Sequence, residues 1–130
     1  MSLNIKIGIV VAIIVILHAV LIAFGVKLWR NRIVKNKIYY DKEKKNLKRI
    51  YFTKRGIMCG EDIFYYPTGE TNKVQNWVNG KKEGPFVVYH KNGKKYIVGN
   101  YQDGMYSGNC SVYDKDGKLF NEYKYEAGKL

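Results

Sequence analysis

The chain has 130 residues, and its 23 Lys and Arg against 11 Asp and Glu give a formal net charge of +12. It contains only two cysteines and two histidines, and none of them has a second Cys or His at the spacing of a metal site. Phosphate-binding loops, nucleophile elbows and zinc-hydrolase motifs are also missing from the sequence. We therefore expect a protein without catalytic activity, without a cofactor and without a metal.

An uncharged apolar run lies near the start of the chain. It covers residues 7–26, between Lys6 and Lys27. A helix of about 20 residues is about 30 Å long, which matches the hydrocarbon core of a bilayer. We predict a transmembrane anchor over residues 1–28, with Trp29 at the membrane interface. A cleaved signal peptide is the alternative, although the run is longer than a usual signal core and no clean cleavage site follows it.

Small residues within the run lie four positions apart, at Gly8 and Ala12 and again at Ala19 and Ala23. This spacing allows two helices to pack closely, so a homo-oligomer through the helix is one hypothesis. His18 is the strongly polar residue of the run. Because it has no acidic partner there, we do not expect it to serve a proton path or a ligand site.

A basic segment, residues 29–60, follows the anchor. From residue 27 to residue 60 there are twelve Lys and Arg and two acids, a net charge of +10, whereas residues 61–130 carry ten Lys and nine acids. A basic residue beside an anionic leaflet contributes about 1 kcal/mol, so this segment is predicted to lie against lipid headgroups. The candidate membrane-surface residues are Lys27, Trp29, Arg30, Arg32, Lys35 and Lys37.

The charge asymmetry also predicts the orientation of the chain. Lys and Arg are dense after the apolar run and sparse before it. The positive-inside rule therefore predicts a single-pass protein of the cytoplasmic (inner) membrane whose C-terminal domain faces the cytoplasm, with export of that domain as the alternative. We expect residues 28–36 to continue the helix beyond the bilayer. Nucleic acid is a rival partner for a basic segment, but we do not expect it because a nearby membrane already accounts for the charge.

Glycines in register indicate a repeat with a 24-residue period in the rest of the chain. The glycine columns are 69, 93 and 117; 56, 80, 104 and 128; and 60, 84 and 108. Aromatic residues keep the same phase at 65, 89 and 113 and at 77, 101 and 125. Asn-Gly and Asp-Gly pairs at 79–80, 92–93, 103–104 and 116–117 favour type I′ turns between short β-branched and aromatic runs. Each period is therefore predicted to form two antiparallel strands.

The predicted fold is a single N-terminal transmembrane α-helix followed by an all-β, single-layer antiparallel β-hairpin repeat sheet. A degenerate first repeat lies within residues 29–60, and three clearer repeats cover 61–84, 85–108 and 109–130. The last strand, near residues 123–127, is predicted to be a sheet edge. Cys59 and Cys110 lie just over two periods apart, roughly 19 Å along such a sheet. That separation is too long for a disulfide, so we predict free thiols.

The repeated motifs resemble a known family. The segments YHKNGK (89–94) and YDKDGK (113–118), with the more divergent YYPTGE (65–70), are followed by WVNG (77–80), YQDG (101–104) and YEAG (125–128). This pattern resembles the MORN repeat (membrane occupation and recognition nexus), most closely the variant found in bacterial proteins, some of which are classed as antitoxins. The resemblance covers about residues 61–130. It implies an elongated sheet used for binding, with no shared catalytic residues.

The resemblance implies a protein partner, which in the antitoxin case is a toxin that the sheet binds and occludes without chemistry. We expect the contacts to come from exposed aromatic and basic side chains, and packing within the sheet is the alternative role for each of them. The candidate partner-binding residues are Trp77, Tyr89, Tyr101, Tyr113, Tyr125, Lys81 and Lys82. The alternative function is a structural subunit or spacer of a membrane-bound or envelope assembly, in which the helix makes the specific contacts.

Overall fold

The computed structural model describes residues 3–126, 128 and 129. Residues 1, 2, 127 and 130, which fall within the predicted anchor and the predicted last repeat, lie outside the described residues. The chain divides into a helical unit, Met1–Arg32, and a sheet unit, Ile33–Leu130.

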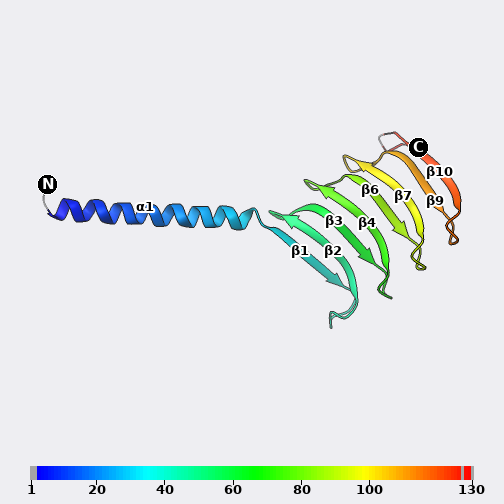
Figure 1. Ribbon diagram of the computed structural model, residues 1–130, viewed down its shortest axis with the longest axis horizontal. Coiled ribbons are helices and arrows are strands. Elements are labelled where there is room, and N and C mark those ends of the chain that lie inside the picture. Colours follow the sequence, from blue (N-terminus) through cyan, green and yellow to red (C-terminus); the bar gives the residue numbers. More distant parts are fainter. Residues whose placement is uncertain (1–2, 127, 130) are drawn as a thin grey trace. The chain divides into compact units, whose positions relative to one another are not determined.

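The helical unit is one continuous helix, α1, Leu3–Arg30 (Figure 1). From Gly8 to Arg30 it is long and apolar enough to cross a membrane, and its side chains are exposed; a signal sequence would have the same length and composition. Lys27 and Arg30 lie in the last turn, where their positive charges interact favourably with the negative end of the helix dipole. His18 bonds through Nδ1 to the Ile14 carbonyl at 2.8 Å, so the backbone of the helix itself satisfies this polar group.

The prediction that residues 28–36 continue the helix is wrong. The helix ends at Arg30, and strand β1, Ile33–Tyr39, begins three residues later. Apolar Ile33 and Val34 and later Ile38 are β-branched, which suits a strand, and pairing with the next strand supplies the backbone hydrogen bonds that a helix would otherwise make. The sequence pattern alone did not reveal that pairing.

The sheet unit is one antiparallel sheet of ten strands. Eight long strands follow each other in space as in sequence: β1, β2 (Leu47–Lys54), β3 (Ile57–Tyr65), β4 (Thr71–Val78), β6 (Gly84–Tyr89), β7 (Lys95–Gln102), β9 (Gly108–Tyr113) and β10 (Leu119–Tyr125) (Figure 1). The short strands β5 (Lys81–Lys82) and β8 (Met105–Tyr106) pair with β4 and β7. The predicted all-β, antiparallel sheet is thus confirmed, and the described part of this unit contains no second layer.

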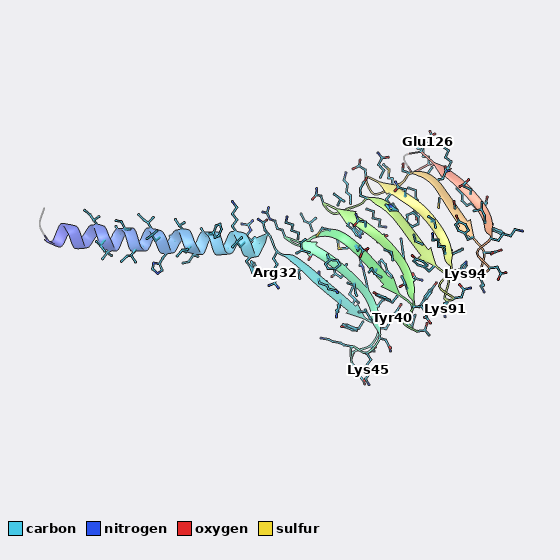
Figure 2. The ribbon with its side chains drawn as sticks, viewed as in Figure 1. Arg32, Tyr40, Lys45, Lys91, Lys94 and Glu126 are labelled. Carbon is cyan, nitrogen blue, oxygen red and sulfur yellow. The ribbon has the colours of Figure 1, made fainter. Side chains whose placement is uncertain are left out.

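The sheet has two free edges, β1 and β10. The edge strand expected near residues 123–127 is β10, although residue 127 itself is not among those described. The segment predicted as a degenerate first repeat supplies β1, β2 and the start of β3 to the same sheet. Side chains extend along the whole sheet, and Tyr40, Lys45, Lys91 and Lys94 lie at one end of the strands (Figure 2).

Type I′ turns are predicted at four dipeptides, and two of these, both at the same end of the strands, adopt that conformation. Both central residues have positive φ at Asn79–Gly80 (49° and 81°) and at Asp103–Gly104 (51° and 88°). The Arg55–Gly56 turn has the same conformation; it lacks an Asn-Gly or Asp-Gly pair, but Gly56 shares the glycine column of Gly80 and Gly104. At this end, the N–H groups of Gly80, Gly104 and Gly128 donate to carbonyls of the preceding hairpin at 2.9 Å, at positions 24 residues apart. The repeat itself stays a prediction from the sequence.

The type I′ prediction is wrong for the turns at the opposite end. At Asn92–Gly93 and Asp116–Gly117 only the glycine has positive φ. The N–H of Gly93 donates to the His90 carbonyl at 2.9 Å, and the N–H of His90 donates to the Lys94 carbonyl at 2.8 Å. These bonds close a longer loop, accompanied by a register shift at Tyr89. Loop length depends on strand register, which a dipeptide does not reveal.

The apolar core is small and is built from aromatic side chains. Phe86, Tyr101 and Cys110 are buried, and Val88, Ile97 and Tyr125 pack partly buried against them. Gly99 lies directly across from Phe86 on the neighbouring strand. A Cβ at this glycine would lie 2.6 Å from Cε1 of the Phe86 ring, so the ring occupies the space that a side chain would need. Gly99 thus makes room for the core rather than forming a turn.

We expect Gly99→Ala to destabilise the sheet by about 1–3 kcal/mol, the usual range for overpacking a core. The Phe86 ring cannot easily retreat, because it packs on Tyr101 and Tyr106 with centroid separations of 4.7 and 5.5 Å. Urea unfolding of the full-length chain in detergent, followed by tyrosine fluorescence, measures the effect. Phe86→Leu in the Gly99→Ala background should recover part of the loss. If the added methyl leaves the unfolding midpoint unchanged, the proposed close packing is incorrect.

Candidate functional site

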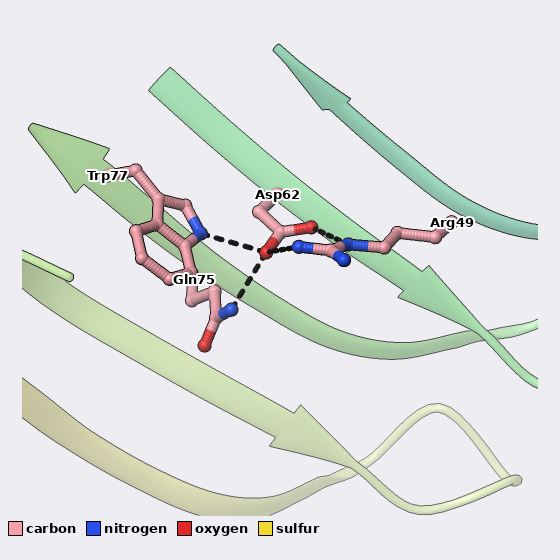
Figure 3. A network of polar contacts seen from close by, with 4 residues as sticks. All are labelled: Arg49, Asp62, Gln75 and Trp77. Carbon is pink, nitrogen blue, oxygen red and sulfur yellow. Dashed lines mark hydrogen bonds and ion pairs between the residues drawn. The ribbon is translucent and has the colours of Figure 1, made fainter. Parts of the chain in front are cut away.

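A buried carboxylate links three neighbouring strands. Asp62 of β3 is fully buried, with 0% of its surface exposed. Arg49 of β2 donates to it through Nε (2.7 Å to Oδ1) and Nη2 (2.8 Å to Oδ2), as Figure 3 shows. From β4, the Gln75 amide and the Trp77 indole N–H each donate to Oδ2 at 2.8 Å. The carboxylate therefore accepts four hydrogen bonds from side chains on both sides of its own strand.

The network keeps Asp62 ionised. Burial alone would raise the pKa of its carboxyl, but the hydrogen bonds from Arg49, Gln75 and Trp77 outweigh burial and lower it. The carboxylate in turn raises the pKa of Arg49, whose guanidinium carbon lies 4.7 Å from the ring centroids of both Tyr51 and Phe64. With its oxygens occupied in this way, Asp62 acts as a structural link between strands. Sequence reasoning missed it, because one acid among strand residues carries no motif.

A second cluster joins two lysines to one aromatic ring. We call Lys73 of β4 and Lys82 of β5 the lysine pair. Their Nζ atoms lie 5.7 and 5.0 Å from the centroid of the Tyr101 ring, within cation–π range. Lys73 also lies 5.4 Å from the Phe86 centroid, and Lys82 lies 5.7 Å from that of Trp77. The charged ends of the pair therefore lie over aromatic rings, and both lysines are half-buried.

Aromatic rings continue from this cluster toward the β10 edge. The Tyr101 ring stacks on Tyr106 with a centroid separation of 5.0 Å, and Tyr106 packs on Tyr125 at 5.2 Å. Burial raises the pKa of Tyr101 most, and its hydrogen bond with Tyr106 raises it further. The phenol therefore stays protonated at any physiological pH. Tyr106 itself is exposed, so this row presents an aromatic surface beside the lysine pair.

The structure brings some predicted partner-binding residues together and separates others. The aromatic and cationic clusters just described include four of these residues: Trp77, Lys82, Tyr101 and Tyr125. The prediction that Tyr101 is exposed is wrong. Only 4% of its surface is accessible, because its ring is the centre on which the neighbouring side chains pack. Sequence reasoning missed Lys73, because a lysine among the polar residues of this strand carries no distinctive signal.

The remaining predicted residues lie elsewhere. Lys81 forms an exposed ion pair with Asp103 at 2.8 Å, between adjacent turns. The Tyr89 carbonyl accepts a hydrogen bond from the Tyr66 hydroxyl at 2.7 Å. Tyr89 also lines a shallow groove of about 450 Å³, together with Val74, Val87 and Pro85. Tyr113 is half-buried, and its carbonyl bonds to Nε2 of His90 at 3.0 Å.

The predicted membrane-surface residues divide between the two units. The end of α1 carries Lys27, Trp29 and Arg30, and Arg32 follows it; all four side chains are exposed. Lys35 and Lys37 lie two positions apart in β1, and both are exposed. Nζ of Lys35 lies 6.0 Å from the Phe52 ring centroid. The two lysines share one face of an edge strand, so they form a short basic row.

The cysteines are free thiols, as predicted. Cys59 is half-buried, and Cys110 is buried, which raises the pKa of its thiol. Across residues 3–126, 128 and 129 there is no group of three or more His, Cys, Asp and Glu that could hold a metal ion.

Comparison with known proteins gives no relative. No protein-family model, no curated protein and no solved structure matches this chain. The similarity to MORN repeats therefore stays a prediction that rests on the sequence motifs themselves.

We expect Asp62→Asn to destabilise the sheet by about 2–4 kcal/mol, because it breaks a buried charge pair and leaves the Arg49 guanidinium without its counter-charge. Asp103→Asn is the matched control, since it removes an exposed ion pair whose side chains are 63% and 68% accessible, and it should change stability little. Chemical unfolding of the full-length chain measures both effects. Equal effects of the two substitutions would contradict a structural role for Asp62.

The lowered pKa of Asp62 should make the free energy of unfolding depend on pH. Its folded-state pKa lies below the ordinary value of 3.8, so its contribution is complete above that value and is lost as the pH falls through the folded-state pKa. The difference in unfolding free energy between the wild type and Asp62→Asn should therefore be constant near neutral pH and shrink as the pH is lowered below 3.8 toward pH 2. A constant difference across this range would show that the carboxylate charge does not stabilise the fold.

Proposed function

We propose that this chain is a membrane-anchored, non-catalytic protein-binding module. The observation that carries the proposal is the surface built on Tyr101, where tyrosine, tryptophan and lysine side chains gather on an uncovered sheet. Aromatic residues are enriched at protein interfaces and supply much of their binding energy. In this sheet they lie on regular strands, which hold them in place before a partner arrives.

The membrane half of the proposal is supported by α1 and its flanks. The helix has the length and composition of a membrane span, and Trp29 and the basic residues that follow it suit a membrane interface. We place the chain in the cytoplasmic membrane as a single-pass protein, with its sheet in the cytoplasm, because Lys and Arg are dense after the helix. In this position the basic residues also contact anionic headgroups.

The resemblance to MORN-type repeats extends the proposal to an antitoxin or immunity-type role. In this role the partner is a toxin, and the sheet protects the cell by binding and occluding it. The extension rests on the resemblance alone. It needs no catalytic group, since occlusion depends only on contact area and on the lifetime of the complex.

The binding proposal predicts that a protein lies on the aromatic surface in cells. A photoreactive phenylalanine derivative replacing Tyr106, whose side chain is 40% accessible, should form a covalent adduct with a protein on illumination. The same derivative replacing Lys115, in the exposed turn before β10, is the control and should form much less. If no protein adduct forms at Tyr106, the binding proposal is wrong.

The same experiment separates a binding module from a structural spacer. In a module the sheet makes the specific contacts, so exchanging residues 7–26 for an unrelated apolar helix should leave the Tyr106 adduct unchanged. In a spacer the helix makes those contacts, and the exchange should abolish both the adduct and the function.

The orientation can be tested with a membrane-impermeant maleimide. Cys110 is buried and would label poorly, so we choose Lys115→Cys in a chain that also carries Cys59→Ser. Labelling only after lysis is expected for a cytoplasmic sheet. Labelling in intact cells would place the sheet outside the cytoplasm and would redirect the search toward extracytoplasmic partners.

A further inference from the structure

The lysine pair has an unusual electrostatic position in the sheet. Both side chains are half-buried, and both ammonium groups lie over the Tyr101 ring. Within the described part of the chain neither ammonium takes part in an ion pair. The neighbouring acids are already engaged, because Asp62 is held by Arg49 and Asp103 by Lys81. Two positive charges therefore share one small surface, and neither forms an ion pair with a described acid.

This arrangement favours an anion. Like charges that lie close together repel, and partial burial weakens the screening that water provides. The pKa of Lys73 is lowered, first by burial and then by the charge of Lys82, and the opposing effect of Asp62 is smaller, which agrees with that repulsion. Among residues 3–126, 128 and 129, the Lys73 ammonium makes one hydrogen bond, a long one of 3.5 Å to the Tyr101 hydroxyl. Both ammonium groups thus keep donors free for an incoming acceptor.

The surroundings favour a carboxylate over a polyanion. Residues 61–130 carry ten Lys and nine acids, so the lysine pair is a local charge on a nearly neutral sheet. Nucleic acids and anionic membranes bind through many distributed positive charges, which this part of the chain lacks. Trp77 and the exposed ring of Tyr106 flank the pair and offer apolar area to residues beside a carboxylate.

We propose that Lys73 and Lys82, supported by Tyr101, form a recognition site for an Asp or Glu side chain in an acidic segment of the protein partner. The inference rests on the proposed function and adds the chemistry of the partner to it. A carboxylate placed between the two ammonium groups makes two charge-assisted hydrogen bonds and removes their mutual repulsion. The buried aromatic rings beneath fix the lysine stems, so little side-chain freedom is lost on binding.

A direct test measures binding of a fluorescein-labelled hexaglutamate peptide to the full-length chain in detergent micelles. The double substitution Lys73→Gln and Lys82→Gln should raise the Kd about tenfold, as expected for the loss of two partly exposed ion pairs. The matched control, Lys115→Gln and Lys118→Gln, removes the same charge from an exposed turn and should change the Kd less than about twofold. Circular dichroism confirms that both variants are folded.

Other results would overturn the inference. Equal weakening by the two double substitutions would indicate a general charge effect instead of a site. A single-stranded oligonucleotide and phosphatidylglycerol vesicles serve as parallel probes. If the lysine-pair substitution weakens binding of either of these and leaves hexaglutamate binding unchanged, the site recognises a polyanion and not an acidic protein segment.

Crosslinking in cells separates this inference from the binding proposal. If the Tyr106 derivative captures a protein in the otherwise wild-type chain and the lysine-pair substitution removes the adduct, both stand. If the adduct persists at the same yield with both lysines substituted, the protein binds but the lysine pair does not recognise it. If the wild-type chain gives no protein adduct, the binding proposal itself fails.

Discussion

The structure depends on one constraint: a sheet of a single layer has no opposing layer to cover its side chains. Burial must therefore come from side chains that lie across their neighbours on the same face. Aromatic rings do this best, which explains why Phe86 and Tyr101 lie at the centre of the core, with Cys110 and partly buried residues around them. It also explains Gly99, whose missing side chain leaves the space that the Phe86 ring occupies over the adjacent strand.

The same constraint gives charged residues a structural role. In a layered protein, Lys and Arg would lie outside the core, but here their stems form part of its cover. Arg49 lies between two rings and neutralises the fully buried Asp62, whereas Lys73 and Lys82 lie over rings without an acid. One cationic cluster is therefore electrostatically complete, and the other is open. The open cluster is the part of the sheet best suited to bind something else.

The two parts of the chain differ in net charge. The excess positive charge lies at and after the apolar helix, where a membrane surface is the expected partner, while the sheet beyond residue 60 is nearly neutral. For the membrane-anchored binding module that we propose, this division of charge would hold the chain at the bilayer without attracting the surface around the lysine pair to the lipid.

The sequence by itself determined the apolar helix, the antiparallel sheet, the free thiols and the type I′ turns at Asn79 and Asp103, because these features depend on local composition and spacing. Only the tertiary structure decided the end of the helix at Arg30, the longer loops at Asn92 and Asp116, the burial of Tyr101, and the partners of Asp62 and Lys73. Each of these depends on strand register, which sets the residues that face each other across neighbouring strands. Register is fixed by pairing between residues far apart in the chain, such as Arg49 and Phe64 or Lys73 and Val88, which lie 15 positions apart, and a local pattern does not contain it.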